Sequence, residues 1–318
     1  MDSICTNWWS ARNRCDFGLQ RRKAKPQEKL GMKIFKVSFH KFISWSALFL
    51  LLSIFPSQST LAAEKPFQRI ISLSPSATEN LFAIGAGKQV IAVDDNSNFP
   101  VNVPRTKLSS FNPSAEAIAK FKPDLVIIQK TATKSAQVSK QLRLLKIRTY
   151  IEKTPVGMSD VYSEILDLGK LTGKVAAANR VVAEVKVARS AALKRVKNSK
   201  LTFYHELDSS LYSATSSTFI GKVYADFGLR NIADAAAKAD DGGYPQLQSE
   251  YVIAANPDII FLADSQYGES AAKIGARTGW STINAIKTGR VIELPADIPS
   301  RWGPRIADFY RLIADAIS

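Results

Sequence analysis

One short pattern occurs twice in the chain and limits the folds that are open to it. A segment that begins at Glu116 reaches Pro-Asp seven and eight residues later and then a buried-looking run at 125–128. The same order and spacing start at Glu250 and lead to the run at 259–262. In each copy, a helix that opens with an acidic residue would precede a strand. The repetition predicts two equivalent α/β units within one chain.

Strands and helices are predicted to alternate through both halves of the chain. Aliphatic runs predict strands at 69–73, 90–93, 125–128, 149–151, 201–204, 259–262 and 291–294. Helical patterns are predicted at 76–85 and 135–146, and a final helix is predicted at 304–317. Since strand, helix and strand follow one another in that order, we expect parallel sheets with helices on their faces.

A proline-free stretch at 159–197 has apolar residues at helical spacing and predicts a long helix between the two units. Gly169 and Gly173 predict a break or bend within it. The expected fold is therefore α/β, with two Rossmann-like lobes, mostly parallel sheets and a long connecting helix. The expected organisation is a leader at 1–63, an N-terminal lobe at 64–156, the connecting helix at 157–198 and a C-terminal lobe at 199–318.

The first 63 residues are typical of a secretory leader. Basic residues between Met32 and Lys41 precede an apolar stretch at 42–55, which is shorter than the ~20 residues of a membrane-spanning helix. Small residues then predict signal-peptide cleavage near Ala62 or Ala63. We expect an exported protein, periplasmic or at the cell surface, with Met32 as the true start; an uncleaved N-terminal anchor is the alternative.

Cysteine and charge exclude several classes of function. Both cysteines, Cys5 and Cys15, precede the apolar stretch, so we expect no disulfide, cysteine metal site, thiol nucleophile or lipidation at the cleavage site. Residues 64–318 carry 33 basic and 25 acidic side chains, a net charge of +8, without a basic block. We therefore expect a solvated basic surface and no nucleic-acid partner.

Five segments carry a resemblance to a known family. They are RIISLSPSATE at 69–79, NPSAE with KPDLV at 112–126, FGLRNI at 227–232, YPQLQSE at 244–250 and SRWGPR at 300–305. In this order and spacing, the chain resembles the iron-complex and vitamin B12 substrate-binding proteins of ABC importers, the class III or long-helix periplasmic binding proteins. The resemblance covers about 67–317.

The resemblance implies capture of a metal-containing ligand between two lobes and delivery to an ABC transporter permease dimer. It implies a monomer without an intrinsic cofactor, whose ligand is a ferric siderophore, cobalamin or haem. Glu116 and Glu250 would dock on arginines of the permease; the alternative is that each only stabilises the first turn of its helix. The loop at 94–100 lacks the aromatic residue that cobalamin binders tend to have near Asn96, which leaves the ligand open.

The resemblance also implies ligand-binding residues. An aromatic residue before each repeated glutamate would line the cleft, here Phe111 and Tyr244. The loop after the last strand, Asp297 through Trp302, would contribute Asp297, Arg301 and Trp302 as further ligand contacts. In that loop, Arg301 could bind a carboxylate or phosphate, and Trp302 offers a flat face to a macrocycle. An Arg301–Asp297 surface bridge beside a packed Trp302 is the alternative.

His205 is the single histidine after the leader, at the end of a predicted strand. It cannot form a multi-histidine zinc site, but it could be an axial ligand to a bound haem or cobalamin, although a hydrogen-bonded structural histidine is the alternative. Glu206 and Tyr212 are candidate ligand contacts from the same region. We expect no metal site of the protein itself.

Enzymatic motifs are missing from the sequence. Residues 85–88 lack the leading glycine and trailing Ser/Thr of a phosphate loop, and there is no Gly-x-Ser-x-Gly elbow. We expect a non-enzyme. The alternative is an exported α/β hydrolase that uses His205 as its base, and it requires a serine within hydrogen-bond reach of that imidazole.

Overall fold

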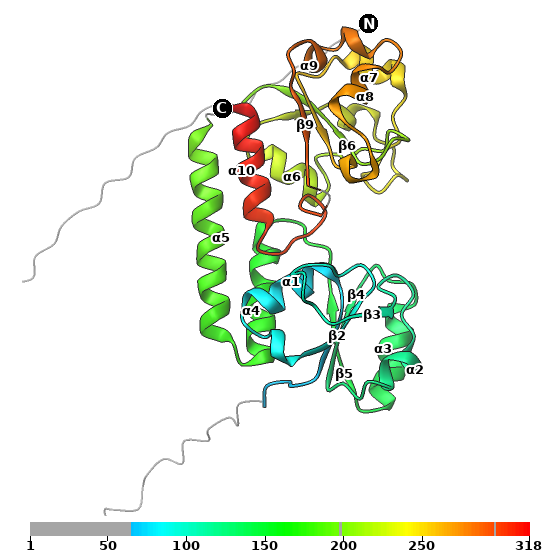
Figure 1. Cartoon of the computed structure of the whole chain (residues 1–318), viewed down its shortest axis with the longest axis vertical. Coiled ribbons are helices and arrows are strands. Elements are labelled where there is room, and N and C mark those ends of the chain that lie inside the picture. Colours follow the sequence, from blue (N-terminus) through cyan, green and yellow to red (C-terminus); the bar gives the residue numbers. More distant parts are fainter. Residues whose placement is uncertain (1–64, 197–198, 296) are drawn as a thin grey trace, which may run out of the picture. The chain divides into compact units, whose positions relative to one another are not determined.

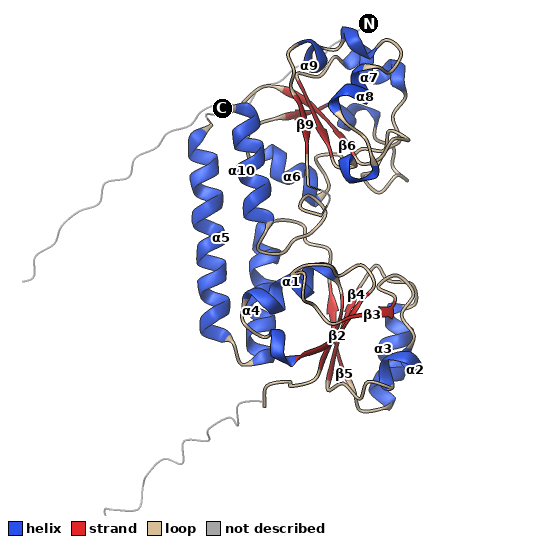
Figure 2. Ribbon diagram, viewed as in Figure 1, coloured by secondary structure: helices blue, strands red, loops and turns tan. Residues whose placement is uncertain are grey.

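A computed structural model describes residues 65–196, 199–295 and 297–318. The predicted leader lies outside the described residues. The described chain contains two separate β-sheets with helices on both faces of each (Figures 1 and 2). The expected α/β class is confirmed.

The first sheet has five parallel strands in the order β3-β2-β1-β4-β5. They are β1 (Ile70–Leu73), β2 (Val90–Asp94), β3 (Arg105–Leu108), β4 (Leu125–Gln129) and β5 (Arg148–Glu152). Ile70 at the centre pairs with Val90 on one side and Leu125 on the other. The edge strand β3 is mostly exposed and has no aliphatic run, which explains why its sequence did not predict it.

The second sheet has four parallel strands in the order β7-β6-β8-β9. They are β6 (Thr202–Glu206), β7 (Arg230–Asn231), β8 (Ile259–Leu262) and β9 (Val291–Glu293). We call β1–β5 with the helices between these strands the first lobe, and β6–β9 with the helices between these strands the second lobe.

The α-helices lie between successive strands along the chain, except for the last one, which follows β9. They are α1 (Pro75–Ala83), α2 (Ala115–Ala119), α3 (Ser135–Leu144), α4 (Met158–Thr172), α5 (Val175–Arg195), α6 (Phe219–Ala225), α7 (Ser249–Ala255), α8 (Ala271–Gly275), α9 (Asn284–Lys287) and α10 (Ile306–Ile317). Within the described ranges, no helix is both long and apolar enough to cross a membrane.

The connector between the lobes consists of two helices, α4 and α5. The break expected near Gly169 and Gly173 occurs at Gly173, whose φ of 70° ends α4 in the left-handed conformation that glycine adopts most easily. Gly169 has a different role: a Cβ atom there would lie 2.5 Å from Cβ of Ala178 on α5. Its missing side chain lets the two helices approach closely. Helix α5 packs against both α4 and α10 (Figure 1).

Three apolar cores hold the described chain together. One lies between the first sheet and α2 with α3, and another lies between the second sheet and its outer helices. The largest is continuous from Ile70 in the first sheet through Ile165 of α4 and Val182 of α5 to Phe261 in the second sheet, and it includes Phe309 of α10. The two sheets therefore share one core through the helices between them.

The repeated Pro-Asp has the same structural task in both lobes. The carboxylate of Asp124 accepts the backbone N–H groups of Gln68 and Arg69, at 2.8 and 2.9 Å, where β1 is about to start. Asp258 accepts the N–H and hydroxyl groups of Thr202, both at 2.8 Å, at the first residue of β6. Each aspartate thus fixes the start of the central strand next to its own, which explains why the sequence carries the pattern twice.

Candidate functional site

The carboxyl edges of the two sheets carry most of the predicted site residues. All paired strands are parallel, so the segments that follow them gather at one edge of each sheet, where ligands bind in α/β folds. In the first lobe, Phe111 follows β3 and is 68% exposed. In the second lobe, Tyr212 follows β6 and is 40% exposed, and Tyr244 is 41% exposed. The segments of these two tyrosines are adjacent, because Tyr212 forms an antiparallel bridge with Gln246.

The loop between β9 and α10, described at 294–295 and 297–305, contacts the first lobe. Its Arg301 donates hydrogen bonds to the side-chain oxygen of Asn98 at 2.6 Å and to the carbonyl oxygen of Asn96 at 3.1 Å. Asp297 pairs with Arg301 at 2.9 Å and accepts a hydrogen bond from Asn98 Nδ2 at 3.1 Å. The loop therefore joins the carboxyl edge of one sheet to that of the other.

A buried glutamate of α1 receives two arginines of this loop. Glu79 is 2% exposed, and its Oε1 accepts from Arg301 Nη1 at 3.2 Å, while Arg305 contacts both of its oxygens. Gly303 lies directly against it, since a Cβ atom there would be 3.0 Å from Glu79 Oε2. The Arg305 guanidinium also stacks on Phe99, 4.0 Å from the ring centre. One buried carboxylate thus neutralises charge from two arginines across the lobe contact.

Trp302 of the same loop contacts both lobes. Its ring meets Phe219 of the second lobe edge to face at 6.4 Å, while its indole N–H donates to Glu152 Oε1 of β5 at 3.0 Å. Its backbone N–H donates to the hydroxyl oxygen of Ser76 at 3.3 Å. Trp302 as a whole is half-buried.

Glu152 is one of two buried acids that lie against each other behind Trp302. Burial raises the pKa of Glu152 to about 7, although hydrogen bonds to its ionised carboxylate act to lower it. Burial and then the charge of Glu152 raise the pKa of Glu164, which also accepts from Asn80 Nδ2 at 3.0 Å. Oε2 of Glu152 has no donor when both acids are ionised. The pair is therefore satisfied only when a proton lies between the two carboxyl groups.

His205 is not placed where it can bind a ligand. It is fully buried in β6, and its Nδ1 lies 2.9 Å from the hydroxyl oxygen of Tyr224. Burial lowers its pKa to about 3, so the imidazole is neutral at ordinary pH. This contact matches the alternative of a hydrogen-bonded structural histidine, and the imidazole has no exposed surface that a ligand could reach. The hydrolase alternative fails as well, because the partner of Nδ1 is a tyrosine and Nε2 has no hydrogen-bond partner.

Glu206 and Arg301 are also engaged within the protein. Glu206 is fully buried and accepts two hydrogen bonds from Arg277, at 2.7 and 2.6 Å. Arg277 in turn bonds Glu269 at 2.9 Å and stacks on Trp280. Arg301 is 8% exposed and surrounded by its partners in the first lobe. Both side chains, Glu206 and Arg301, are therefore already paired with partners inside the protein. The Arg301–Asp297 pair exists, but it is part of a buried contact rather than a surface bridge.

The two glutamates of the repeat occupy equivalent places. Glu116 is the second residue of α2 and Glu250 is the second residue of α7, and both side chains are exposed. Glu116 lies 3.5 Å from the ammonium group of Lys120, a pair in which both side chains remain open to solvent. These positions fit stabilisation of the helix start and leave the carboxylates accessible.

Several residues of the lobe contact were not predicted as site residues. Glu79, Asn98, Glu152, Glu164 and Arg305 gain their importance from partners far away in the sequence. The one available sequence signal is an acid that directly follows a predicted strand, as Glu152 follows the run at 149–151. In the part of the chain that the structure describes, no cluster of three or more His, Cys, Asp or Glu residues could hold a metal ion.

Comparison with known proteins extends over both sheets. The profile of a family described as periplasmic binding protein matches residues 70–298. The chain is 29% identical over 269 residues to an uncharacterized ABC transporter substrate-binding lipoprotein, YvrC, of Bacillus subtilis (strain 168), an alignment that covers 82% of this chain and 83% of the relative. It is 27% identical over 265 residues to a vitamin B12-binding protein of Vibrio vulnificus (strain CMCP6), with 82% and 91% covered.

Among solved structures, a possible iron-binding (periplasmic solute-binding) protein from Staphylococcus epidermidis ATCC 12228 superposes with a TM-score of 0.67 at 28% identity. The match covers 80% of this chain and 99% of that one. Both lobes and the helices between them therefore have counterparts in a solved protein.

Proposed function

The chain belongs to the periplasmic binding protein family, and from this we propose that it is the extracytoplasmic substrate-binding protein of an ABC importer. It binds a metal-containing small molecule between its lobes and delivers it to a permease without changing it chemically. The observation that carries the proposal is the arrangement of the carboxyl edges. Exposed aromatic residues lie at the edge of each sheet, and the loop between β9 and α10 holds the two edges together.

The ligand is a corrinoid, a haem or a ferric siderophore. Relatives named for cobalamin or vitamin B12 support this class. Phe111, Tyr212 and Tyr244 supply exposed aromatic area for a large ring system. Trp302 and Asp297, each partly exposed, complete the proposed contacts. His205, Glu206 and Arg301 support the architecture instead.

Ligand identity can be tested by titrating the purified protein with cobalamin, haemin and ferric siderophores while recording visible absorption and tryptophan fluorescence. We expect one class to bind with saturation, and Phe111→Ala or Tyr244→Ala to weaken that binding at least about tenfold through lost apolar contact. Val187→Ala, which removes an exposed apolar side chain on α5, is the matched control and should leave binding unchanged. Saturation by none of the three, or turnover of any of them, would reject the proposal.

Glu116 and Glu250 are the proposed docking points for the permease. Their equivalent places in the two lobes and their exposure support the assignment, because each can pair with a basic residue of a partner. Replacing both with alanine should abolish uptake into cells and leave ligand affinity unchanged. The control is Glu184→Ala, an exposed acid on α5, which should support normal uptake.

Export through the leader is also a proposal. Cleavage near Ala62 or Ala63 would release a chain that begins just before the described residues. The relative in B. subtilis is named a lipoprotein, whereas this chain has no cysteine after Cys15 that could carry a lipid. Intact-mass measurement of the protein from the exported fraction checks the cleavage site; a mass that still includes 42–55 would support the anchor alternative.

A further inference from the structure

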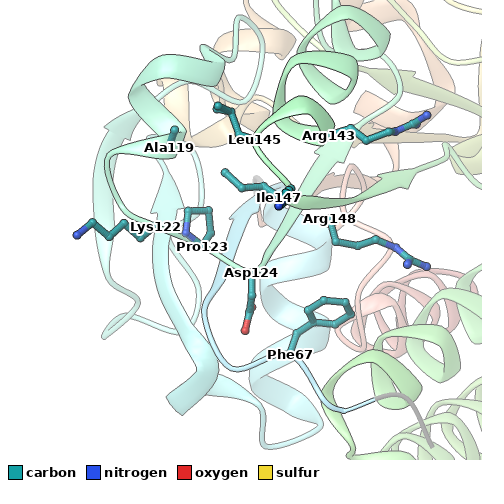
Figure 3. A pocket seen from close by; sticks show the side chains of 10 residues that line it. Phe67, Ala119, Lys122, Pro123, Asp124, Arg143, Leu145, Ile147 and Arg148 are labelled. Carbon is teal, nitrogen blue, oxygen red and sulfur yellow. The ribbon is translucent and has the colours of Figure 1, made fainter. Parts of the chain in front are cut away.

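A pocket of about 790 Å³ lies at the edge of the first sheet opposite to the candidate site. It is lined where strands begin, by Phe67 just before β1, Pro123 just before β4 and Ile147 just before β5. Its floor is apolar, and its rim includes the basic residues Lys122 and Arg143 (Figure 3). The carboxylate of Asp124 is also in this pocket, but backbone N–H groups next to β1 already occupy both of its oxygens.

Two lysines at this pocket have a backbone conformation that lysine seldom adopts. Lys122 has a φ of 51° and Lys146 a φ of 61°. The second lobe has the same two turns: Asn256 stands before its Pro-Asp with a φ of 47°, and Gly289 ends the helix before β9 with a φ of 67°. Asparagine and glycine are the residues that favour this left-handed region. The first lobe therefore has lysine at two positions where the second lobe has residues that adopt this backbone conformation with less strain.

The side chains around the pocket do not converge on one point. Figure 3 shows Lys122 extending away on one side and Arg143 on the other, with Pro123 and Ile147 between them. Between Arg143 and Lys146, Leu144 and Leu145 are 78% and 56% exposed. A compact anion such as phosphate needs converging donors. Diverging cations with exposed leucines between them match an extended surface that carries many negative groups above an apolar layer.

We propose that this face of the first lobe binds a membrane surface that contains anionic phospholipids. Lys122, Arg143 and Lys146 pair with lipid phosphates, while Leu144 and Leu145 enter the interface between headgroups and acyl chains. The inference does not depend on which ligand the other edge binds.

Vesicle co-sedimentation tests the proposal with the protein purified from the exported fraction. We expect the protein to bind vesicles of equal parts phosphatidylglycerol and phosphatidylcholine and not to bind vesicles of phosphatidylcholine alone. Binding to the anionic vesicles should fall steeply as the salt concentration rises. The informative variant combines Lys122→Asn with Lys146→Gly, which installs the residues of the second lobe. It should fold at least as well as the wild type, because both residues tolerate positive φ, yet bind vesicles about thirtyfold more weakly from two lost contacts.

A matched control removes two exposed lysines from the second lobe, Lys273→Asn with Lys287→Asn, and should change vesicle binding less than about threefold. Equal losses in both double variants would overturn the proposal in favour of general charge attraction. Unchanged binding of the Lys122→Asn, Lys146→Gly variant would overturn it as well. So would displacement of the protein from vesicles by inorganic phosphate at constant ionic strength, which would indicate a compact anion site. Ligand titrations of the same variants separate this outcome from any failure of the proposed transport function.

Discussion

The carboxylate of Glu79 accepts hydrogen bonds from the guanidinium of Arg305, a residue 226 positions later in the chain. Glu79 belongs to α1 of the first lobe, and Arg305 directly precedes α10. Arg301 reaches the same carboxylate. The first helix and the last loop of the described chain are therefore held together by one buried acid.

Removing the charge of that acid should destabilise the protein strongly. We expect Glu79→Gln to lower the free energy of unfolding by about 3–5 kcal/mol, because two arginines would lose their buried counter-charge. Equilibrium unfolding in urea measures the change. Asp308→Asn is the control, since it removes an acid that pairs with the exposed Arg311 and should cost less than about 1 kcal/mol. Similar losses in the two variants would show that the buried contact has no special weight.

The buried acid pair should give stability a specific dependence on pH. The pKa of Glu152 is raised from 4.5 to about 7 in the folded state, so the folded protein holds more protons than the unfolded chain between these values. This contribution is complete below about pH 4.5 and is lost as pH rises through about 7. Glu152→Gln keeps an acceptor for the Trp302 indole and cannot ionise.

We therefore expect the Glu152→Gln variant and the wild type to be about equally stable at pH 4.5, and the variant to be more stable by about 3 kcal/mol above pH 7. Urea unfolding of both proteins across this range gives the difference directly. The difference between the two proteins is needed because His205 also makes stability depend on pH. Its lowered pKa reduces the free energy of unfolding of both proteins as pH falls from about 6.5 toward 3. Parallel profiles for the two proteins would contradict the assignment.

His205 should affect folding and leave ligand chemistry unchanged. His205→Asn removes the imidazole that bonds Tyr224 inside the second lobe, and we expect it to lower the free energy of unfolding by about 1–3 kcal/mol. If haemin binds the wild type, the visible spectrum of the complex should be the same in the variant. A shifted Soret band would show that the imidazole reaches the iron after all.

A methyl group added at Gly169, where α4 contacts α5, should destabilise the protein. Helix propensity alone would make Gly169→Ala stabilising. Because the new Cβ would lie 2.5 Å from Cβ of Ala178, we instead expect a loss of about 1–3 kcal/mol, measured by thermal or urea unfolding. Ala178→Gly in the same chain should recover part of the loss by making room. A stabilised Gly169→Ala protein would mean that the helices separate easily.

The features that the sequence predicted well depend on neighbours along the chain. Strand β1 and the broken connector follow from apolar runs and from Gly173, and the repeat predicted related units because Asp124 and Asp258 each fix a strand start. Strand β3 was missed because an edge strand buries little and needs no aliphatic pattern.

The polar site was predicted less well, and the reason is distance in sequence. Glu206 is neutralised by Arg277, 71 residues later, and Glu152 meets Trp302 across 150 residues. Nothing in the local sequence pattern distinguishes an acid that is paired within the protein from one that contacts a ligand. His205 shows the same difficulty, since its position at a strand end suits both a ligand contact and a buried hydrogen bond.

The apolar core that joins both sheets through α4, α5 and α10 has a consequence for how the protein is made. Helix α5 packs against α10, which contributes Phe309 to this core and follows all other described elements in the sequence. Neither half should survive as an independent fragment, and a calorimeter should record one melting transition for the whole. A nascent chain should therefore lack a complete core until α10 has been synthesised.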